Sequence, residues 1–208
     1  SDVYKRQVYS PEGKQPWDDA VTLVLTYAEI PYDVVYDTKI LTGELPKYDW
    51  LHLHHEDFTG QYGKFYRAYR SAAWYQEEVA RQSGTAEIMG FQKVSEMKRS
   101  VAQDIRDFVL GGGFLFTMCS GTDSYDIALA AQEVDICGPM FDGDVADPAA
   151  QSKMQFDAGL AFQDYQLEMD PLVYEFSEID GTKDHSDIKP INDFFTLFDF
   201  SAKWEIVP

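Results

Sequence analysis

Residues 111–131, GGGFLFTMCSGTDSYDIALAA, constrain the fold more than any other stretch of this sequence. A glycine run is followed by an apolar run of strand type, then by a cysteine and small polar residues that precede a helical pattern. A strand that leads through a tight turn into a helix is the basic unit of α/β folds. The stretch therefore predicts a buried strand over 114–118, a turn at Cys119 and a helix over 124–132.

The rest of the chain continues this alternation of strands and helices. Strands are predicted over 8–9, 32–36, 48–55 and 194–200, and helices over 16–30, 65–82 and 94–110. Strands that alternate with helices favour a mostly parallel sheet with helices on both of its faces. The predicted fold class is α/β, a three-layer α/β/α domain of flavodoxin-like type.

Length and composition fit one domain with a sizeable core, because the chain has 208 residues and is 45% hydrophobic. Residues 1–7 lack an initiator methionine and are predicted to be a leader that is not native to the domain. We expect residues 8–208 to form a single domain that is cut at both ends, with an irregular insertion over 134–189. Short strands are predicted within the insertion over 156–162, 165–169 and 173–176.

The formal net charge of −19 narrows the class of partner. So acidic a surface repels phosphate backbones and anionic lipid surfaces, and no basic cluster offsets it, so neither nucleic acid nor a membrane is an expected partner. No apolar run is long enough for a transmembrane helix. These features leave a small molecule as the expected partner. They leave the oligomeric state open, and the compartment as well, with the cytoplasm as the default.

Cys119 is the candidate nucleophile, because functional sites in open α/β sheets form at the carboxyl edge where strands end. The following helix points free N–H groups and the positive end of its dipole at the thiol, which stabilises a thiolate. The N–H groups after Cys119, at Ser120 and Gly121, are predicted to bind a developing oxyanion. This is the nucleophile elbow of hydrolases with cysteine in place of serine. The alternative is a structural cysteine, which is the role predicted for Cys137.

A second polar cluster lies at the end of the strand predicted over 48–55. His55 is the last residue of this strand, and Glu56 and Asp57 enter the loop at the carboxyl edge, where we expect all three to line a substrate pocket beside the cysteine. The alternatives are hydrogen bonding at a strand end, or a metal bound by the histidines. Asp123 is predicted either to be an acid at a helix N-terminus or to contact an amine of the ligand.

No motif in the sequence requires a cofactor, and no metal site is predicted. Residues 142–147, DGDVAD, hint at calcium but lack the glutamate and the spacing of an EF-hand loop, so a solvated acidic loop is expected. Aromatic residues are frequent in the stretch over 65–82, where core packing is expected and a sugar-stacking surface is the alternative. They are Tyr66, Tyr69, Trp74 and Tyr75.

Residues 117–121, TMCSG, resemble the Gly-x-Cys-x-Gly elbow of class I glutamine amidotransferase-like domains, with Thr117 in place of the first glycine. Longer stretches resemble a Bacteroidota family labelled asparagine synthetase B: SPEGKQPWDDAVTLVLTYAEIPYDVVYD, YDWLHLHHEDFTGQYGKFY, MCSGTDSYDIALAA and FFTLFDFSAKW. The resemblance implies amide hydrolysis or nitrogen transfer through a thioester on Cys119. It also implies a histidine and an acid on a late strand.

His185 is the histidine that follows Cys119 in the chain, but it lies in a polar segment, KDHSD, that does not match the family's strand. The catalytic histidine is therefore expected beyond Pro208. The N-terminal cysteine and the phosphate loop of asparagine synthetase proper do not occur in the sequence. The alternative function is a non-catalytic or carbohydrate-related binding domain on the same fold, which would resemble trehalose-utilisation proteins.

Overall fold

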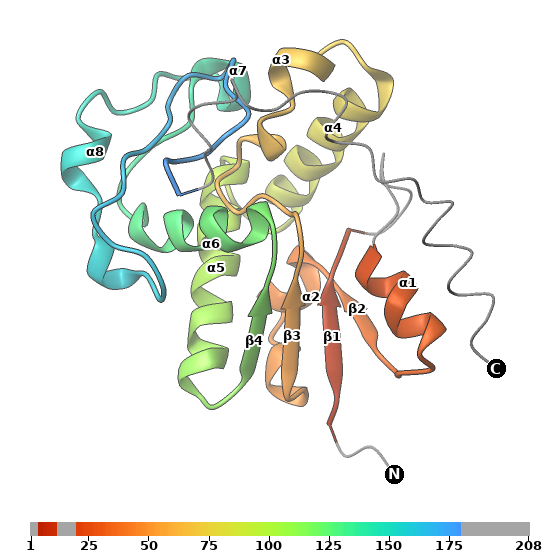
Figure 1. The fold of residues 1–208 in the computed structure, drawn as a ribbon. Helices are drawn as coiled ribbons and strands as arrows, with labels where there is room; N and C mark the ends of the chain where they lie inside the picture. Colours follow the sequence, from red (N-terminus) through yellow and green to blue (C-terminus); the bar gives the residue numbers. More distant parts are fainter. Residues whose placement is uncertain (1–3, 12–19, 180–208) are drawn as a thin grey trace, which may run out of the picture.

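The structure is a computed structural model that describes residues 4–11 and 20–179 (Figure 1). Its sheet has four strands in the order β2-β1-β3-β4, and every neighbouring pair is parallel. The strands are β1 Arg6–Tyr9, β2 Asp33–Val35, β3 Trp50–Leu53 and β4 Phe114–Thr117. This is the flavodoxin-like order, in which the winding direction reverses between β1 and β3. The predicted α/β fold class is confirmed.

Helices lie on both faces of the sheet (Figure 1). The longer ones are α1 Ala20–Tyr27, α4 Ala73–Ile88, α5 Val94–Leu110 and α6 Ser120–Ala130. The short helices are α2 Asp37–Leu41, α3 Tyr66–Tyr69, α7 Pro139–Asp142 and α8 Ala150–Lys153. Three 3-10 turns complete the described part, η1 Leu45–Lys47, η2 Tyr62–Lys64 and η3 Phe156–Ala158.

The main core lies between the sheet and the helices α2, α5 and α6. Helix α5 supplies an apolar face because its buried residues recur every three or four positions, as in Met97, Val101 and Ile105. Val101 and Ile105 share one hydrophobic cluster with Leu51 and Leu53 of β3. Met97 belongs to a second cluster. The core therefore fixes the strand ends of β1 and β3 against α5, and the site described below lies at those ends.

Helix α5 has the bounds that the sequence predicts, whereas the helix predicted over 16–30 ends at Tyr27 and two further helices differ as well. The helix predicted over 65–82 is divided into α3 and α4, with Ala72 in extended conformation at the N-cap of α4. Helix α6 begins at Ser120 rather than at 124, because the chain enters the helix directly from the turn at Cys119. The earlier start of α6 tightens the junction between strand and helix that the sequence suggests.

The sheet also begins earlier than the predicted domain boundary at residue 8. Arg6 and Gln7 belong to β1, and Gln7 pairs with Asp33 on one side and with Leu51 on the other. Gln7 is buried in this position between two neighbouring strands. The last residues of the predicted leader are thus part of the central strand pair.

The strands predicted in the insertion do not form within the described part, up to residue 179. Residues 156–158 are a 3-10 turn, and the pairing seen nearby is an isolated antiparallel bridge between Leu167 and Ser177. The backbone N–H groups of residues 160–162 donate to the carboxylate of Asp126 in α6, at 2.6 to 3.1 Å. A buried side chain takes these donors, so the prediction of a strand over 156–162 was wrong.

Two further predictions fall outside the residues that the structure describes, the strand over 194–200 and the polar segment around His185. Among the helices of the described ranges, none combines the length and the apolar character that crossing a membrane requires.

Candidate functional site

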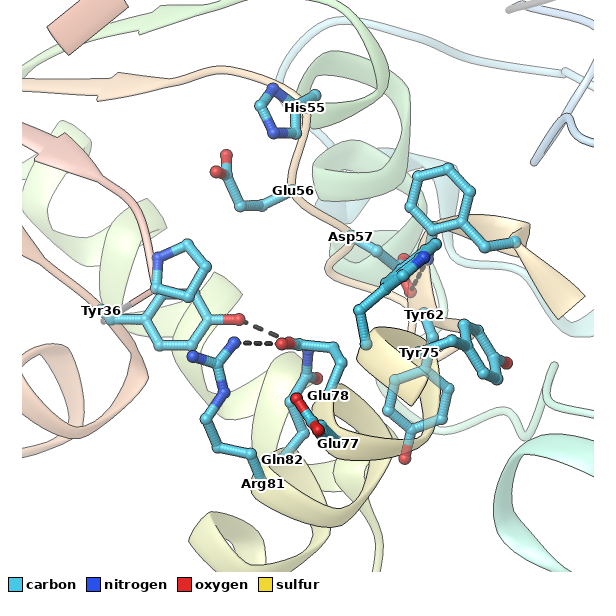
Figure 2. Close-up of a pocket in the computed structure, with 14 residues that line it drawn as sticks. Tyr36, His55, Glu56, Asp57, Tyr62, Tyr75, Glu77, Glu78, Arg81 and Gln82 are labelled. Carbon is cyan, nitrogen blue, oxygen red and sulfur yellow. Dashed lines mark hydrogen bonds and ion pairs between the residues drawn. The ribbon is translucent and has the colours of Figure 1, made fainter. Parts of the chain in front are cut away.

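A cavity of about 330 Å³ opens at the carboxyl ends of the central strands (Figure 2). Pro11 follows β1, Tyr36 follows β2 and His55 follows β3, and all three line it. Helix α4 contributes the opposite wall. The cavity therefore lies at the point where the winding direction reverses, which is where open α/β sheets bind their ligands.

The lining combines aromatic rings with carboxylates. The predicted pocket residues His55, Glu56 and Asp57 all take part, whereas Cys119 and Asp123 are not among the lining residues. The aromatic members are Tyr36, Tyr62, Phe65, Trp74 and Tyr75, and the acidic members are Glu56, Asp57, Glu77 and Glu78. Such a lining can stack on an apolar or sugar face and accept hydrogen bonds from N–H or O–H groups.

Asp57 holds the loop that borders the cavity. Its carboxylate accepts hydrogen bonds from the backbone N–H of Thr59 at 2.7 Å, from the Thr59 hydroxyl at 2.6 Å and from the Gly63 N–H at 3.3 Å. Tyr62, Gly63 and Lys64 all have positive φ, a conformation that costs energy for residues other than glycine. Asp57 therefore stabilises a strained turn, and the turn places Tyr62 against the cavity.

Lys64 turns away from the cavity and is buried. Its ammonium donates to the Glu168 carbonyl and lies 5.6 Å from the ring centre of Phe176, so it ties the insertion to the loop after β3. Removal from water disfavours the charged form, and the pKa of Lys64 is lowered to about 8.

A buried charged network contacts the cavity through Tyr36. Lys98 of α5 and Asp37 of α2 are 1% and 0% exposed, and the Lys98 Nζ lies 2.8 Å from the Asp37 Oδ2. The same ammonium donates to the hydroxyls of Tyr9 at 3.0 Å and Tyr36 at 3.2 Å. The Tyr9 hydroxyl donates to the other Asp37 oxygen. A buried pair of opposite charges with these extra hydrogen bonds holds both phenols in place.

The cavity wall on α4 has its own polar contacts. Arg81 is paired with Glu78, and the Gln82 side-chain amide donates to Glu78 and to the Tyr36 hydroxyl, the latter at 3.4 Å (Figure 2). Burial and the neighbouring Asp37 raise the pKa of Tyr36 well above its usual value. Tyr36 is therefore a neutral phenol held between α5 and α4.

Cys119 lies where β4 gives way to α6, and its side chain is exposed. Its backbone has φ 49° and ψ −145°, a region in which residues other than glycine are strained. The backbone therefore makes the sharp turn that the sequence predicts at this cysteine. Nucleophile elbows use a strained turn of this kind to present a side chain above the sheet.

The elbow is attached to the loop that follows β3. The Gly121 N–H donates to the His54 carbonyl at 3.0 Å, and the Ser120 hydroxyl donates to the His55 carbonyl at 2.8 Å. The Ser124 hydroxyl donates to the Glu56 carbonyl at 3.0 Å. The start of α6 is thus fixed to the segment that lines the cavity, and His55 contacts α6 while also lining the cavity.

The remaining predicted site residues lie inside the protein. Asp123 is buried within α6 and accepts from the Ser124 N–H at 2.7 Å, in keeping with an acid in the first turn of a helix. Cys137 is 0% exposed, and its Sγ lies 3.2 Å from the Thr59 carbonyl oxygen. Burial, with Asp57 nearby, raises the pKa of the Cys137 thiol. These contacts fit the structural role predicted for Cys137.

The acidic loop that hinted at calcium surrounds a lysine instead. The Lys93 Nζ lies 2.6 Å from carboxylate oxygens of Asp135 and Asp144, and 3.3 Å from one of Asp142. Asp135, Cys137 and Asp142 have the spacing of a metal site, but the ammonium already supplies the positive charge for the two aspartates. The loop is therefore held by ion pairs.

Tyr36, Gln82 and Lys98 were not among the site residues predicted from the sequence. Tyr36 directly follows a strand at the carboxyl edge, the same signal that identified the segment at 55–57. Lys98 interrupts the apolar face of α5 between Val94 and Ala102, and a lysine at such a position needs a buried partner. Gln82 gave no signal that separates it from a solvent-facing helix residue.

Comparison of the chain with protein-family models, with curated proteins and with solved structures gave no match.

Proposed function

We propose that the protein catalyses amide hydrolysis or nitrogen transfer with Cys119 as the nucleophile, as class I glutamine amidotransferase-like domains do. The observation that carries the proposal is the backbone of Cys119, a strained and exposed turn between a parallel strand and the N-terminus of α6. Strain at a non-glycine residue persists only where the surroundings impose it, and it concentrates at functional sites. The resemblance to the family labelled asparagine synthetase B supports the same chemistry.

The proposed reaction forms and breaks one bond at the amide carbon in each of two steps. The Cys119 thiolate attacks the carbonyl carbon, the C–S bond forms, and the carbonyl becomes an oxyanion. The Ser120 N–H stabilises this oxyanion, because the Gly121 N–H already donates to His54. The C–N bond then breaks, and ammonia leaves with a proton from the general acid. Water releases the acyl group from sulfur as a carboxylic acid.

The substrate would reach the elbow from the cavity. His55 lines the cavity, and its carbonyl accepts the Ser120 hydroxyl, so the two regions are joined through one residue. The family resemblance assigns the general base to a histidine on a late strand, and His185 and the strand over 194–200 lie outside the described residues. In this proposal the loop after β3 binds the substrate, and the elbow at Cys119 carries out the chemistry.

The test is ammonia release from L-glutamine and L-asparagine by the wild-type protein and two matched variants. Cys119→Ala removes the nucleophile and is expected to lower the rate by a factor of at least ~10³. Cys137→Ala removes the other thiol and is expected to keep most of the activity. Equal rates for the wild-type protein and Cys119→Ala would refute the proposal.

The second candidate function is carbohydrate binding without catalysis. It is favoured by one observation, that the cavity is lined by aromatic rings and carboxylates while Cys119 is not among its lining residues. Aromatic faces and carboxylates are common partners of sugar C–H and O–H groups. Titration of Cys119→Ala with trehalose separates the candidates, because a sugar-binding domain needs no thiol and loses no affinity.

A further inference from the structure

The hydrogen bonds of Lys98 have only one possible direction. Its ammonium has three N–H donors and no acceptor. All three are used, on Asp37 Oδ2 at 2.8 Å, on the Tyr9 hydroxyl oxygen at 3.0 Å and on the Tyr36 hydroxyl oxygen at 3.2 Å. Both phenol oxygens therefore accept a hydrogen bond from the buried lysine.

Gln82 supplies a second donor to the Tyr36 oxygen. Its Nε2 contacts Glu78 Oε1 and, at 3.4 Å, the Tyr36 hydroxyl. An ionised carboxylate can only accept, so the NH₂ end of the amide must face Glu78, and its second hydrogen points at Tyr36. The Tyr36 oxygen thus receives hydrogen bonds from Lys98 and from Gln82.

Tyr9 and Tyr36 differ in where their own hydroxyl hydrogens go. Tyr9 donates to Asp37, which completes its hydrogen bonds inside the protein. The Tyr36 hydroxyl finds no acceptor among residues 4–11 and 20–179, although it lines the cavity and faces the α4 wall (Figure 2). A raised pKa keeps this hydrogen in place at neutral pH. Within the described residues, the cavity therefore contains a phenol whose oxygen accepts two hydrogen bonds and whose own hydrogen has no acceptor.

We propose that the cavity binds an uncharged group that combines an acceptor oxygen with N–H or O–H donors, and that Tyr36 donates to that oxygen. A carboxamide and a sugar diol share this chemistry. The carboxylate of Glu56 is buried in the cavity wall and accepts from the donor side of the same group. The proposal deepens the proposed function by naming the group bound at its cavity, and it does not require Cys119.

A simple cation is the ligand that the proposal excludes. Aromatic rings beside carboxylates would by themselves suit a quaternary ammonium ion. Such an ion has no acceptor for the Tyr36 hydrogen and would leave that polar group buried without a partner, which costs affinity. The aromatic rings and carboxylates of the cavity would accept either kind of ligand. The Tyr36 hydrogen favours the ligand that has an acceptor oxygen over the cation.

The experiment is calorimetric titration of Cys119→Ala protein, in which turnover cannot occur, with L-glutamine, trehalose and tetramethylammonium. Glutamine and trehalose separate the two sources of the shared chemistry, and at least one is expected to bind. Adding Tyr36→Phe is expected to weaken that binding about tenfold, the value of one hydrogen bond of about 1.4 kcal/mol. The matched control is Tyr48→Phe, whose hydroxyl contacts Asp33 away from the cavity.

Two substitutions at Gln82 test the direction of the hydrogen bond. Gln82→Glu replaces the donor with an acceptor, which draws the Tyr36 hydrogen away from the ligand, so about the same tenfold loss is expected. Gln82→Met removes the donor without offering an acceptor, so Tyr36 still donates and the loss of affinity is expected to be smaller than in Gln82→Glu. A purely structural role for Gln82 would weaken binding to the same extent in both variants.

Four results would overturn the proposal. They are binding of neither glutamine nor trehalose, binding of tetramethylammonium as tight as that of either, unchanged affinity in Tyr36→Phe, and equal loss in Gln82→Glu and Gln82→Met. These outcomes are separate from those of the ammonia assay. If ammonia release depends on Cys119 while Tyr36→Phe binds glutamine normally, the proposed function stands and this inference fails.

Discussion

Gly121 lies directly against the backbone of His54. Its N–H donates to the His54 carbonyl oxygen at 3.0 Å, and a Cβ at position 121 would come within 2.6 Å of the same oxygen. The contact joins the first turn of α6 to the loop after β3, and so joins the elbow to the cavity wall. Only a residue without a side chain permits this approach.

Gly121→Ala is therefore expected to displace the elbow. Real Cβ atoms do not approach a carbonyl oxygen this closely, so the backbone must shift, at a cost of about 1–3 kcal/mol. The free energy of unfolding by urea measures the effect. Gly84→Ala is the matched control, because no atom of the described residues lies within 4 Å of its added Cβ and alanine favours the interior of α4. A loss at both positions would contradict the steric explanation.

Lys98→Met is expected to destabilise the fold by about 3–5 kcal/mol, since it leaves the Asp37 carboxylate buried without its cationic partner. Lys47→Met breaks the exposed pair with Glu44 and is expected to cost at most about 1 kcal/mol. Thermal unfolding of the two variants against the wild-type protein provides the comparison. Similar effects for both would show that the buried pair contributes no more than a surface pair.

Lys64 is expected to make stability depend on pH in the alkaline range. Its pKa is about 8 in the folded protein and 10.5 as an ordinary lysine, so between these values the unfolded state binds more protons than the folded state. The free energy of unfolding therefore rises as the pH increases from about 8 to 10.5. Below pH 8 Lys64 is protonated in both states and contributes no such pH dependence. The full difference is about 3 kcal/mol.

The measurement is the free energy of unfolding of wild-type and Lys64→Met protein across this range. The wild-type protein should gain stability relative to the variant as the pH rises, because methionine keeps the apolar stem and does not titrate. Subtraction of the two curves removes the contribution of the tyrosines. A difference that stays constant between pH 8 and 10 would contradict the lowered pKa.

The two cysteines should differ in their reaction with iodoacetamide in the folded protein. Cys119 is exposed, whereas Cys137 is fully buried and has a pKa raised by burial. One label per chain at Cys119 is expected at neutral pH, with Cys137 labelled only after unfolding. Peptide mapping by mass spectrometry assigns the labels, and early labelling of Cys137 would show that its surroundings open readily.

The sequence was most informative where local rules agree with the tertiary structure. The bounds of α5 follow from its apolar periodicity and from the glycines at 111–113, and the turn at Cys119 follows from the strand-to-helix pattern. The segment at 55–57 follows from its place after a strand. Each of these signals depends only on neighbours in the sequence.

The rest depends on partners that are distant in the chain. Tyr36, Lys98 and Gln82 meet through separate elements, and no local pattern places them together. The strand predicted over 156–162 failed because the Asp126 carboxylate binds backbone donors that a strand would need. Hydrogen bonds of this kind, between residues that are distant in the sequence, override local propensity.

The most direct test of Cys119 as a nucleophile is its labelling rate with a chloroketone analogue of glutamine, compared with a simple chloroketone of similar intrinsic reactivity. The glutamine analogue is expected to label Cys119 much faster, free glutamine is expected to slow this labelling, and Cys119→Ala is expected to take up no label. Equal rates for the two reagents, without protection by glutamine, would contradict the role of Cys119 as a nucleophile.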